Sequence, residues 1–293
     1  LYFLVVSVIV NLALDILLVR NFGMGVEGAA IATVFSYFVA AVFAGIYVLK
    51  KEKSLDVKLS DLKLSGRHCW EQLKLGIPVS LQFTITSIGS MVLQTAINAF
   101  GSSAIAAITA AGRVEQVMNI PMSGLGVSNS TFVSQNYGAK QYERILRSVK
   151  NIFILDLLVS VACSAVLIFA GPHVVQWFVD EPDAQLLSYA DQYLYTIGGC
   201  YMFVSVLFVF RNTLQGLGCT YANAIAGAGE LVGRILVAYL FTPVFGFAAV
   251  CFAGPCAWVL ADIPLIVIYL RKRKKFQALI QSQEGVKPCR TTM

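Results

Sequence analysis

Four polar side chains lie close together in a long apolar part of the chain: Arg113, Glu115, Gln116 and Asn119. At 100° per residue, Glu115, Gln116 and Asn119 fall on one helical face, about 100° wide. Small or polar residues complete this stripe: Gly112, Ser123, Gly126 and Ser130. Arg113 points elsewhere, because residues two apart do not face each other on a helix. An ordered stripe of this kind is expected to face a helix bundle or an aqueous cavity.

Glu115 is the member of the stripe with the clearest chemistry. An acid near the middle of a bilayer costs about 2.5–3.5 kcal/mol on insertion scales, so such acids are functional by default. We predict that Glu115 binds a coupling cation or attracts a cationic substrate. The alternative is a structural acid with a partner on another helix. The glycines and serines favour close helix packing.

The preceding apolar segment also carries a polar face. Gln94 and Asn98 are four residues apart on it, and hydroxyl side chains lie on the same side. Two adjacent helices with polar faces predict a shared aqueous cavity, lined by Gln94, Asn98 and Asn119.

Glu230 and Arg234 form a third feature, spaced i,i+4 with the acid first, which is the favourable order for a helical ion pair. We include Glu230 among the candidate ion-pathway residues, while a purely structural pair remains open. The chain has two His residues, and its seven Cys show no zinc or disulfide spacing. Without a nucleophile–base pair or metal ligands, no enzyme and no cofactor are predicted.

The elements that hold these residues are apolar. The 293 residues are 57% hydrophobic and 13% charged, and the mean hydropathy is +0.73. Soluble domains carry about 25% charged residues, so an all-α polytopic membrane protein is predicted. Eight runs are long enough to span a bilayer: 1–19, 29–49, 75–100, 104–135, 151–170, 186–210, 222–241 and 247–270.

Lysines and arginines predict the orientation. If the segment after Leu49 is cytoplasmic, nineteen of the 22 Lys and Arg residues lie in inside segments, among which we count Arg211, and one lies outside. The basic C-terminus is then cytoplasmic.

A weak internal repeat predicts the domains. A shift of 221 residues places Gly25–Ala32 on Gly246–Ala253, so the second span matches the eighth and the repeat unit is six helices. Repeats of this kind are typical of transporters. We predict two helices of an N-terminal lobe (1–49), a cytoplasmic linker (50–74), a six-helix C-terminal lobe (75–271) and a basic tail (272–293).

Several stretches resemble multidrug and toxic compound extrusion (MATE) transporters of the DinF-like bacterial branch. "LDILLVRNFGMGVEGAAIAT" (Leu14–Thr33) is similar to their fifth-to-sixth helix junction, and "LKLGIPVSLQ" (Leu73–Gln82) to the start of their seventh helix. "RVEQVMNIPMSGLGVSNSTFVSQNYGAK" (Arg113–Lys140) is similar to the eighth, and "RNTLQGLG" and "GELVGRILVAYLF" to the tenth and eleventh.

The resemblance implies twelve helices in two lobes, of which the first four are expected to precede this chain. Some members carry an acid in the seventh helix, where Thr86 stands here.

The resemblance also implies an H⁺- or Na⁺-coupled antiporter that exports lipophilic, often cationic, drugs by alternating access. The expected setting is the bacterial cytoplasmic membrane, with a monomeric transporter, small-molecule substrates and no nucleic acid. A lipid-linked oligosaccharide flippase of the same superfamily is the alternative. It predicts a more basic cavity than Arg113 and Arg234 provide.

Overall fold

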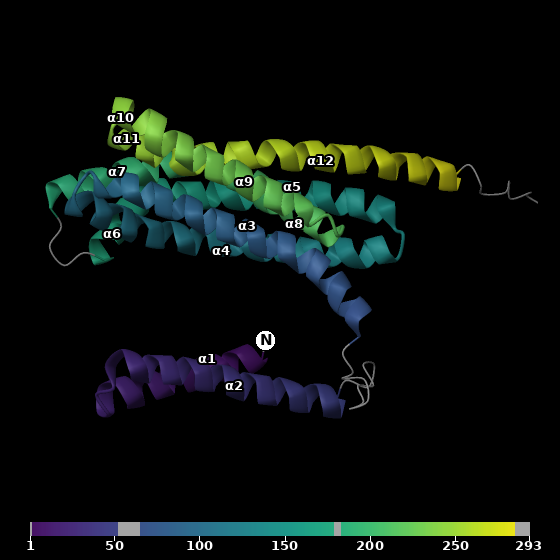
Figure 1. Ribbon diagram of the computed structural model, residues 1–293, viewed down its shortest axis with the longest axis horizontal. Helices are drawn as coiled ribbons and strands as arrows, with labels where there is room; N and C mark the ends of the chain where they lie inside the picture. Colours follow the sequence, from purple (N-terminus) through teal and green to yellow (C-terminus); the bar gives the residue numbers. More distant parts are fainter. Residues whose placement is uncertain (1, 52–64, 179–182, 285–293) are drawn as a thin grey trace, which may run out of the picture. The chain divides into compact units, whose positions relative to one another are not determined.

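The computed structural model describes residues 2–51, 65–178 and 183–284, and every regular element in these ranges is helical. The chain divides into two compact units, Leu1–His68 and Cys69–Met293. Figure 1 labels their helices. The prediction of an all-α membrane fold is confirmed.

The first unit is a helical hairpin. It contains α1 (Tyr2–Asp15), the π-helical turn η1 (Ile16–Asn21) and α2 (Gly25–Lys51). Gly23 and Gly25 reverse the chain with φ angles of +66° and +55°, which glycine adopts without steric cost. The Ser7 hydroxyl donates a hydrogen bond to the Ser36 carbonyl oxygen at 3.2 Å, which joins the two helices.

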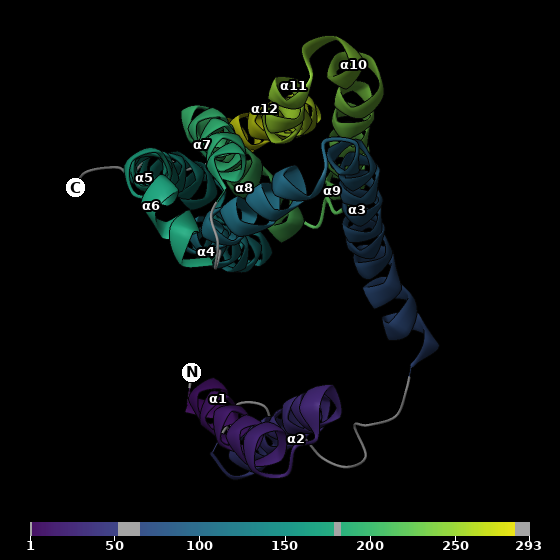
Figure 2. The ribbon, with the colours of Figure 1, turned by 90° about the vertical axis from the view of Figure 1, so that its left-hand side faces the viewer.

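The second unit is a helix bundle, seen along its helices in Figure 2. Its elements are α3 (Gly66–Asn98), α4 (Ser102–Gly138), α5 (Tyr142–Phe169), α6 (Gly171–Val175), η3 (Gln176–Phe178), α7 (Ala184–Gly199), α8 (Met202–Gly216), α9 (Tyr221–Leu236), η4 (Val237–Phe241), α10 (Thr242–Phe245), α11 (Phe247–Cys251) and α12 (Ala253–Glu284). The first three residues of α3 belong to the other unit.

Six helices of the described part are long and apolar enough to cross a membrane, and a seventh span results if α7 and α8 count as one. These two helices are bent by 55° at their junction. The remaining predicted span, 104–135, is the continuous helix α4, which fails the same hydropathy test. Its polar stripe explains this, because the stripe lowers the mean hydropathy of the helix. The expected number of eight spans is therefore not established.

Several helix ends differ from the predicted boundaries. The α3 helix begins at Gly66, although its apolar run begins at Leu75. The α12 helix continues to Glu284, although we predicted a tail from residue 272. Charged residues are good helix formers, so a helix continues beyond its apolar part. Residues 52–64 of the predicted linker and 285–293 of the predicted tail lie outside the described residues.

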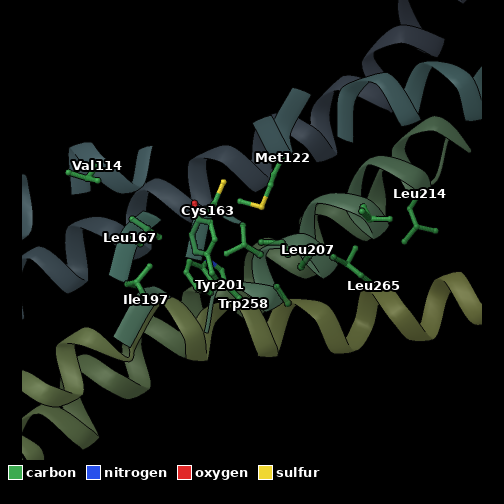
Figure 3. Packing of buried hydrophobic residues seen from close by; sticks show 14 of the residues in the cluster. Val114, Met122, Cys163, Leu167, Ile197, Tyr201, Leu207, Leu214, Trp258 and Leu265 are labelled. Atoms are coloured by element: carbon green, nitrogen blue, oxygen red, sulfur yellow. The ribbon is translucent and has the colours of Figure 1, made fainter. Parts of the chain in front are cut away.

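The core of the bundle surrounds Tyr201, which is fully buried at the junction of α7 and α8 (Figure 3). Its ring makes an edge contact with Trp258 of α12, with ring centroids 6.3 Å apart. Met122 of α4 and Leu167 of α5 are buried in the same cluster. Because α4, α5 and α12 share this cluster with the bend, the position of the bend is fixed by packing.

Glycines bring α9 against two neighbours. A Cβ on Gly229 would lie 2.7 Å from the Leu260 carbonyl oxygen, and one on Gly233 would lie 2.8 Å from the Ala257 Cα, both on α12. A Cβ on Gly227 would lie 3.2 Å from the Gln82 Cα on α3. The pair Gly229 and Gly233 is a G-x-x-x-G motif, which allows two helix backbones to approach closely in a membrane.

Candidate functional site

Glu230 of α9 lies at the centre of a buried ionic cluster. The residue is 3% exposed. Its Oε1 forms an ion pair with Nη2 of Arg211 from α8. Its Oε2 lies 3.7 Å from Nη1 of Arg234, one turn further along α9. The predicted pair of Glu230 and Arg234 is therefore present, but Arg211 is the arginine that also donates a hydrogen bond to Glu230.

The α3 helix completes the cluster through Thr86. Its hydroxyl donates a hydrogen bond to Oε2 of Glu230 at 3.2 Å. Its carbonyl oxygen accepts one from Nη1 of Arg234 at 3.1 Å. Gly89 makes room for this arginine, because a Cβ there would lie 3.1 Å from the Arg234 Cδ. Thr86 therefore binds both the acid and the base of the α9 pair.

Asp262 of α12 is a second acid beside this cluster. It is 5% exposed, and it interacts electrostatically with both Arg211 and Glu230. Within the described residues, neither of its carboxylate oxygens nor Nε of Arg211 has a hydrogen-bond partner. The cluster thus connects α3, α8, α9 and α12 through two acids, two arginines and the Thr86 side chain.

Arg211 lies inside a helix, although the sequence interpretation placed it between two predicted spans. We assigned it to a cytoplasmic segment, whereas the structure places it in α8, with a side chain that is 15% exposed. The preceding apolar run ends at Phe210, so hydropathy marks a boundary there although the helix continues to Gly216. Nothing in the local sequence reveals the partner, because Glu230 follows 19 positions later on another helix.

Glu115 has neutral hydrogen-bond partners. The Tyr193 hydroxyl of α7 donates to its Oε2 at 2.7 Å, and the Asn119 side chain also interacts with the carboxylate. Asn119 in turn accepts a hydrogen bond from the Tyr201 hydroxyl through its Oδ1, at 3.1 Å. Arg234 attracts Glu115 electrostatically without a direct ion pair. Part of the α4 stripe therefore faces α7 and the bend before α8.

The other predicted residues lie apart from this group. Gln94 and Asn98 are exposed on α3, and Nε2 of Gln94 donates a hydrogen bond to Oδ1 of Asn98 at 3.0 Å. Gln116 and Arg113 are exposed on α4. The candidate residues Gln94, Asn98, Glu115, Asn119 and Glu230 fall into three groups. Glu115 and Asn119 form one, Gln94 and Asn98 another, and Glu230 with its cluster the third. Among the described residues, no hydrogen bond or ion pair joins a candidate of one group to a candidate of another. The shared cavity remains a prediction.

Asp156 of α5 is a further buried acid. It is fully buried beside Ser205 of α8, and neither carboxylate oxygen has a hydrogen-bond partner among the described residues. Groups of three or more His, Cys, Asp or Glu that could hold a metal ion do not occur in the described part of the chain.

Replacing Thr86 by valine should destabilise the bundle by about 1.5–3 kcal/mol, because a hydrogen bond to a charged group is lost while the side-chain shape is kept. The measurement is equilibrium unfolding in detergent. A thiol-reactive dye can report the exposure of the buried Cys163, Cys219 and Cys251.

Thr84→Val is the matched control for this substitution. Thr84 is exposed, and its hydroxyl donates only to the Ser80 carbonyl oxygen of its own helix. The control should change stability by less than about 0.5 kcal/mol. Equal effects of the two substitutions would show that the contact between Thr86 and Glu230 contributes nothing.

Comparison with known proteins gives one family. A family model described as MatE matches residues 78–240. A probable multidrug resistance protein of Bacillus subtilis is 26% identical over 83% of this chain and 53% of its own length. A multidrug export protein of Staphylococcus haemolyticus is 24% identical over 91% of this chain and 59% of its own. A protein of Shewanella oneidensis named as an FAD transporter is 28% identical over 77% of this chain and 50% of its own.

Solved structures agree in fold. A multidrug resistance MATE family transporter in an outward-facing conformation matches with a TM-score of 0.83 at 24% identity, over 96% of this chain and 62% of that one. A MOP superfamily transporter from Pyrococcus furiosus matches with a TM-score of 0.82 at 23% identity, over 95% and 62%. The chain therefore spans between half and two thirds of the length of these proteins.

Proposed function

The chain belongs to the MatE family, and from this we propose that it forms part of a cation-coupled efflux transporter for lipophilic, often cationic compounds. The family assignment agrees with the resemblance in sequence. The relatives and the solved structures are transporters, in agreement with the prediction that the chain is not an enzyme. The site supports different roles for two acids, Glu115 and Glu230.

Glu115 is the acid we propose for the coupling cation or the cationic substrate. The single observation that carries this proposal is its set of hydrogen-bond partners, Tyr193 and Asn119, which are neutral. Among the described residues, its negative charge is therefore not balanced by a direct ion pair, and a partly buried carboxylate of this kind gains by binding a proton, Na⁺ or an organic cation. Glu230 instead forms ion pairs with two arginines, so we propose that it holds helices together.

The neighbours of Glu115 suggest how binding is transmitted. Tyr193 of α7 and Tyr201, which lies at the bend between α7 and α8, both reach α4. When a cation neutralises Glu115, the hydrogen bond from Tyr193 loses its charged acceptor and weakens, because charge-assisted hydrogen bonds are about twice as strong as neutral ones. We propose that this change biases the bend and so favours one of the two access states.

Glu115→Gln in the purified transporter should lower ethidium efflux from proteoliposomes at least about tenfold, or about 1.4 kcal/mol in the barrier. The amide keeps the size of the side chain but cannot bind a cation by charge. Efflux is measured under an imposed H⁺ gradient and under an imposed Na⁺ gradient. Wild-type rates under both gradients would rule out a coupling role for Glu115.

Glu143→Gln is the control. Glu143 is a carboxylate on α5 with a side chain that is 71% exposed, in an i,i+4 pair with Arg147, and its loss should leave efflux unchanged.

An anionic substrate is the second candidate, because one relative is named as an FAD transporter. A flippase for lipid-linked sugars would also need a basic site. Arg211 and Arg234 both pair with Glu230, and Arg211 also interacts with Asp262, which supports cationic substrates instead. Uptake of ethidium, FAD and a lipid-linked sugar into the same proteoliposomes separates the three possibilities. We also propose that the basic end of α12 lies on the cytoplasmic side.

A further inference from the structure

A hollow of about 660 Å³ lies between α5, α8 and α12. It opens at the end of the bundle where the start of α5 meets the second half of α12. The stacked rings of Tyr142 and Phe276, with centroids 5.0 Å apart, hold these two helices together there. The hollow is lined by Glu143, Leu146, Arg147, Val149, Lys150, Phe153, Phe210, Tyr269, Arg273 and Gln277. Neither Glu115 nor Glu230 lines it.

The floor of the hollow is aromatic. The ring of Phe210 from α8 lies 5.9 Å from the ring of Phe153 and 4.9 Å from that of Tyr269, measured between centroids. Leu146 and Val149 extend this apolar surface along α5. Three helices thus contribute to one apolar wall, of which the most buried members are Val149, at 2% exposure, and Tyr269, at 8%.

The rim of the hollow is cationic. Arg147, Lys150 and Arg273 are exposed around it, with one acid, Glu143, among them. Glu143 pairs with Arg147 at 3.0 Å, but both side chains are more than 70% exposed. Such surface pairs contribute about 0–1 kcal/mol, so Arg147 can exchange this partner for a phosphate. The formal charge of the rim is positive.

The spacing between rim and floor corresponds to a lipid. Arg147 and Phe153 are six residues apart on α5, which is about 9 Å along a helix. Cationic side chains at the level of the headgroups and aromatic rings below them match the boundary between phosphates and acyl chains. Basic pockets between membrane helices bind anionic headgroups.

We propose that this hollow binds one anionic diacyl phospholipid. The headgroup phosphate lies between Arg147, Lys150 and Arg273, and an acyl chain packs on Phe153 and Phe210. The inference rests on charge complementarity at the rim together with the aromatic floor, and on the chain spanning a membrane. It does not depend on which substrate is transported.

The test is native mass spectrometry of the purified, delipidated protein, titrated with phosphatidylglycerol or with phosphatidylcholine of the same acyl chains. The wild type should bind phosphatidylglycerol at least about tenfold more tightly than phosphatidylcholine. The triple variant Arg147→Gln, Lys150→Gln, Arg273→Gln should lose this preference. All three side chains are exposed, so the fold should tolerate the substitutions.

The matched control is Arg271→Gln, Lys274→Gln, Lys275→Gln. These exposed cations lie beside Arg273 on α12, do not line the hollow and carry the same total charge as the three residues of the test variant. The control should keep the lipid preference. Equal losses in the two triple variants would overturn the proposal in favour of general surface attraction, as would a wild type that does not distinguish the lipids. Displacement of the lipid by an equal concentration of water-soluble glycerophosphoglycerol would also overturn it, because the acyl chain would then contribute nothing.

Discussion

Glu230→Gln should lower the free energy of unfolding by about 3–5 kcal/mol. Removing one partner of a buried ion pair leaves an uncompensated charge, which costs far more than the pair itself contributes. Here the loss of a single carboxylate leaves the mostly buried guanidinium groups of Arg211 and Arg234 without the acid that pairs with both. The measurement is equilibrium unfolding in detergent, in which the labelling of the buried cysteines by the dye is the signal.

Two further variants sharpen this test. Glu143→Gln also removes an acid from an i,i+4 pair with an arginine, but on the surface, and it should cost less than about 0.5 kcal/mol. In the Glu230→Gln background, Arg211→Gln should recover part of the stability, because it removes one of the two uncompensated charges. A loss for Glu230→Gln no larger than that for Glu143→Gln would contradict the ionic cluster.

Gly233→Ala should destabilise the bundle by about 1–3 kcal/mol, and Gly229→Ala should do the same. The added methyl group would lie 2.8 Å from the Ala257 Cα in the first case and 2.7 Å from the Leu260 carbonyl oxygen in the second. These atoms belong to the α12 backbone and cannot rotate away. The two helices must therefore separate, which also disturbs Glu230, one position after Gly229. The measurement is again equilibrium unfolding.

Gly124→Ala is the control for both glycine substitutions. Gly124 lies within α4, and a Cβ there would meet no atom of the described residues within 4 Å outside the neighbouring backbone of its own helix. Alanine is favoured over glycine in a helix by about 0.5–1 kcal/mol, so this control should be neutral or stabilising. The change in the free energy of unfolding therefore distinguishes the effect of close packing, which lowers stability, from that of helix propensity, which raises it. A stabilising effect of Gly233→Ala would show that α9 and α12 are further apart than the structure has them.

Hydropathy alone predicts the class of the fold, because a bilayer imposes a strict rule. Backbone groups in lipid must bond within their own segment, so long apolar runs become helices. The same rule made the pair of Glu230 and Arg234 predictable, since residues four apart on one helix must be neighbours. The stripe containing Glu115 and Asn119 follows from the same periodicity.

Which acids have a cationic partner depends on contacts between helices that are far apart in the sequence. Arg211 reaches Glu230 from α8, and Thr86 reaches it from α3, 144 positions earlier. Glu115 meets a tyrosine 78 positions later, on α7. Such contacts depend on which helix faces are apposed. That in turn depends on backbone approach at positions such as Gly227 and Gly233, which periodicity within a single helix cannot specify. A bend such as that between α7 and α8 likewise follows from the packing around Tyr201, because hydropathy records only the apolar character of each segment.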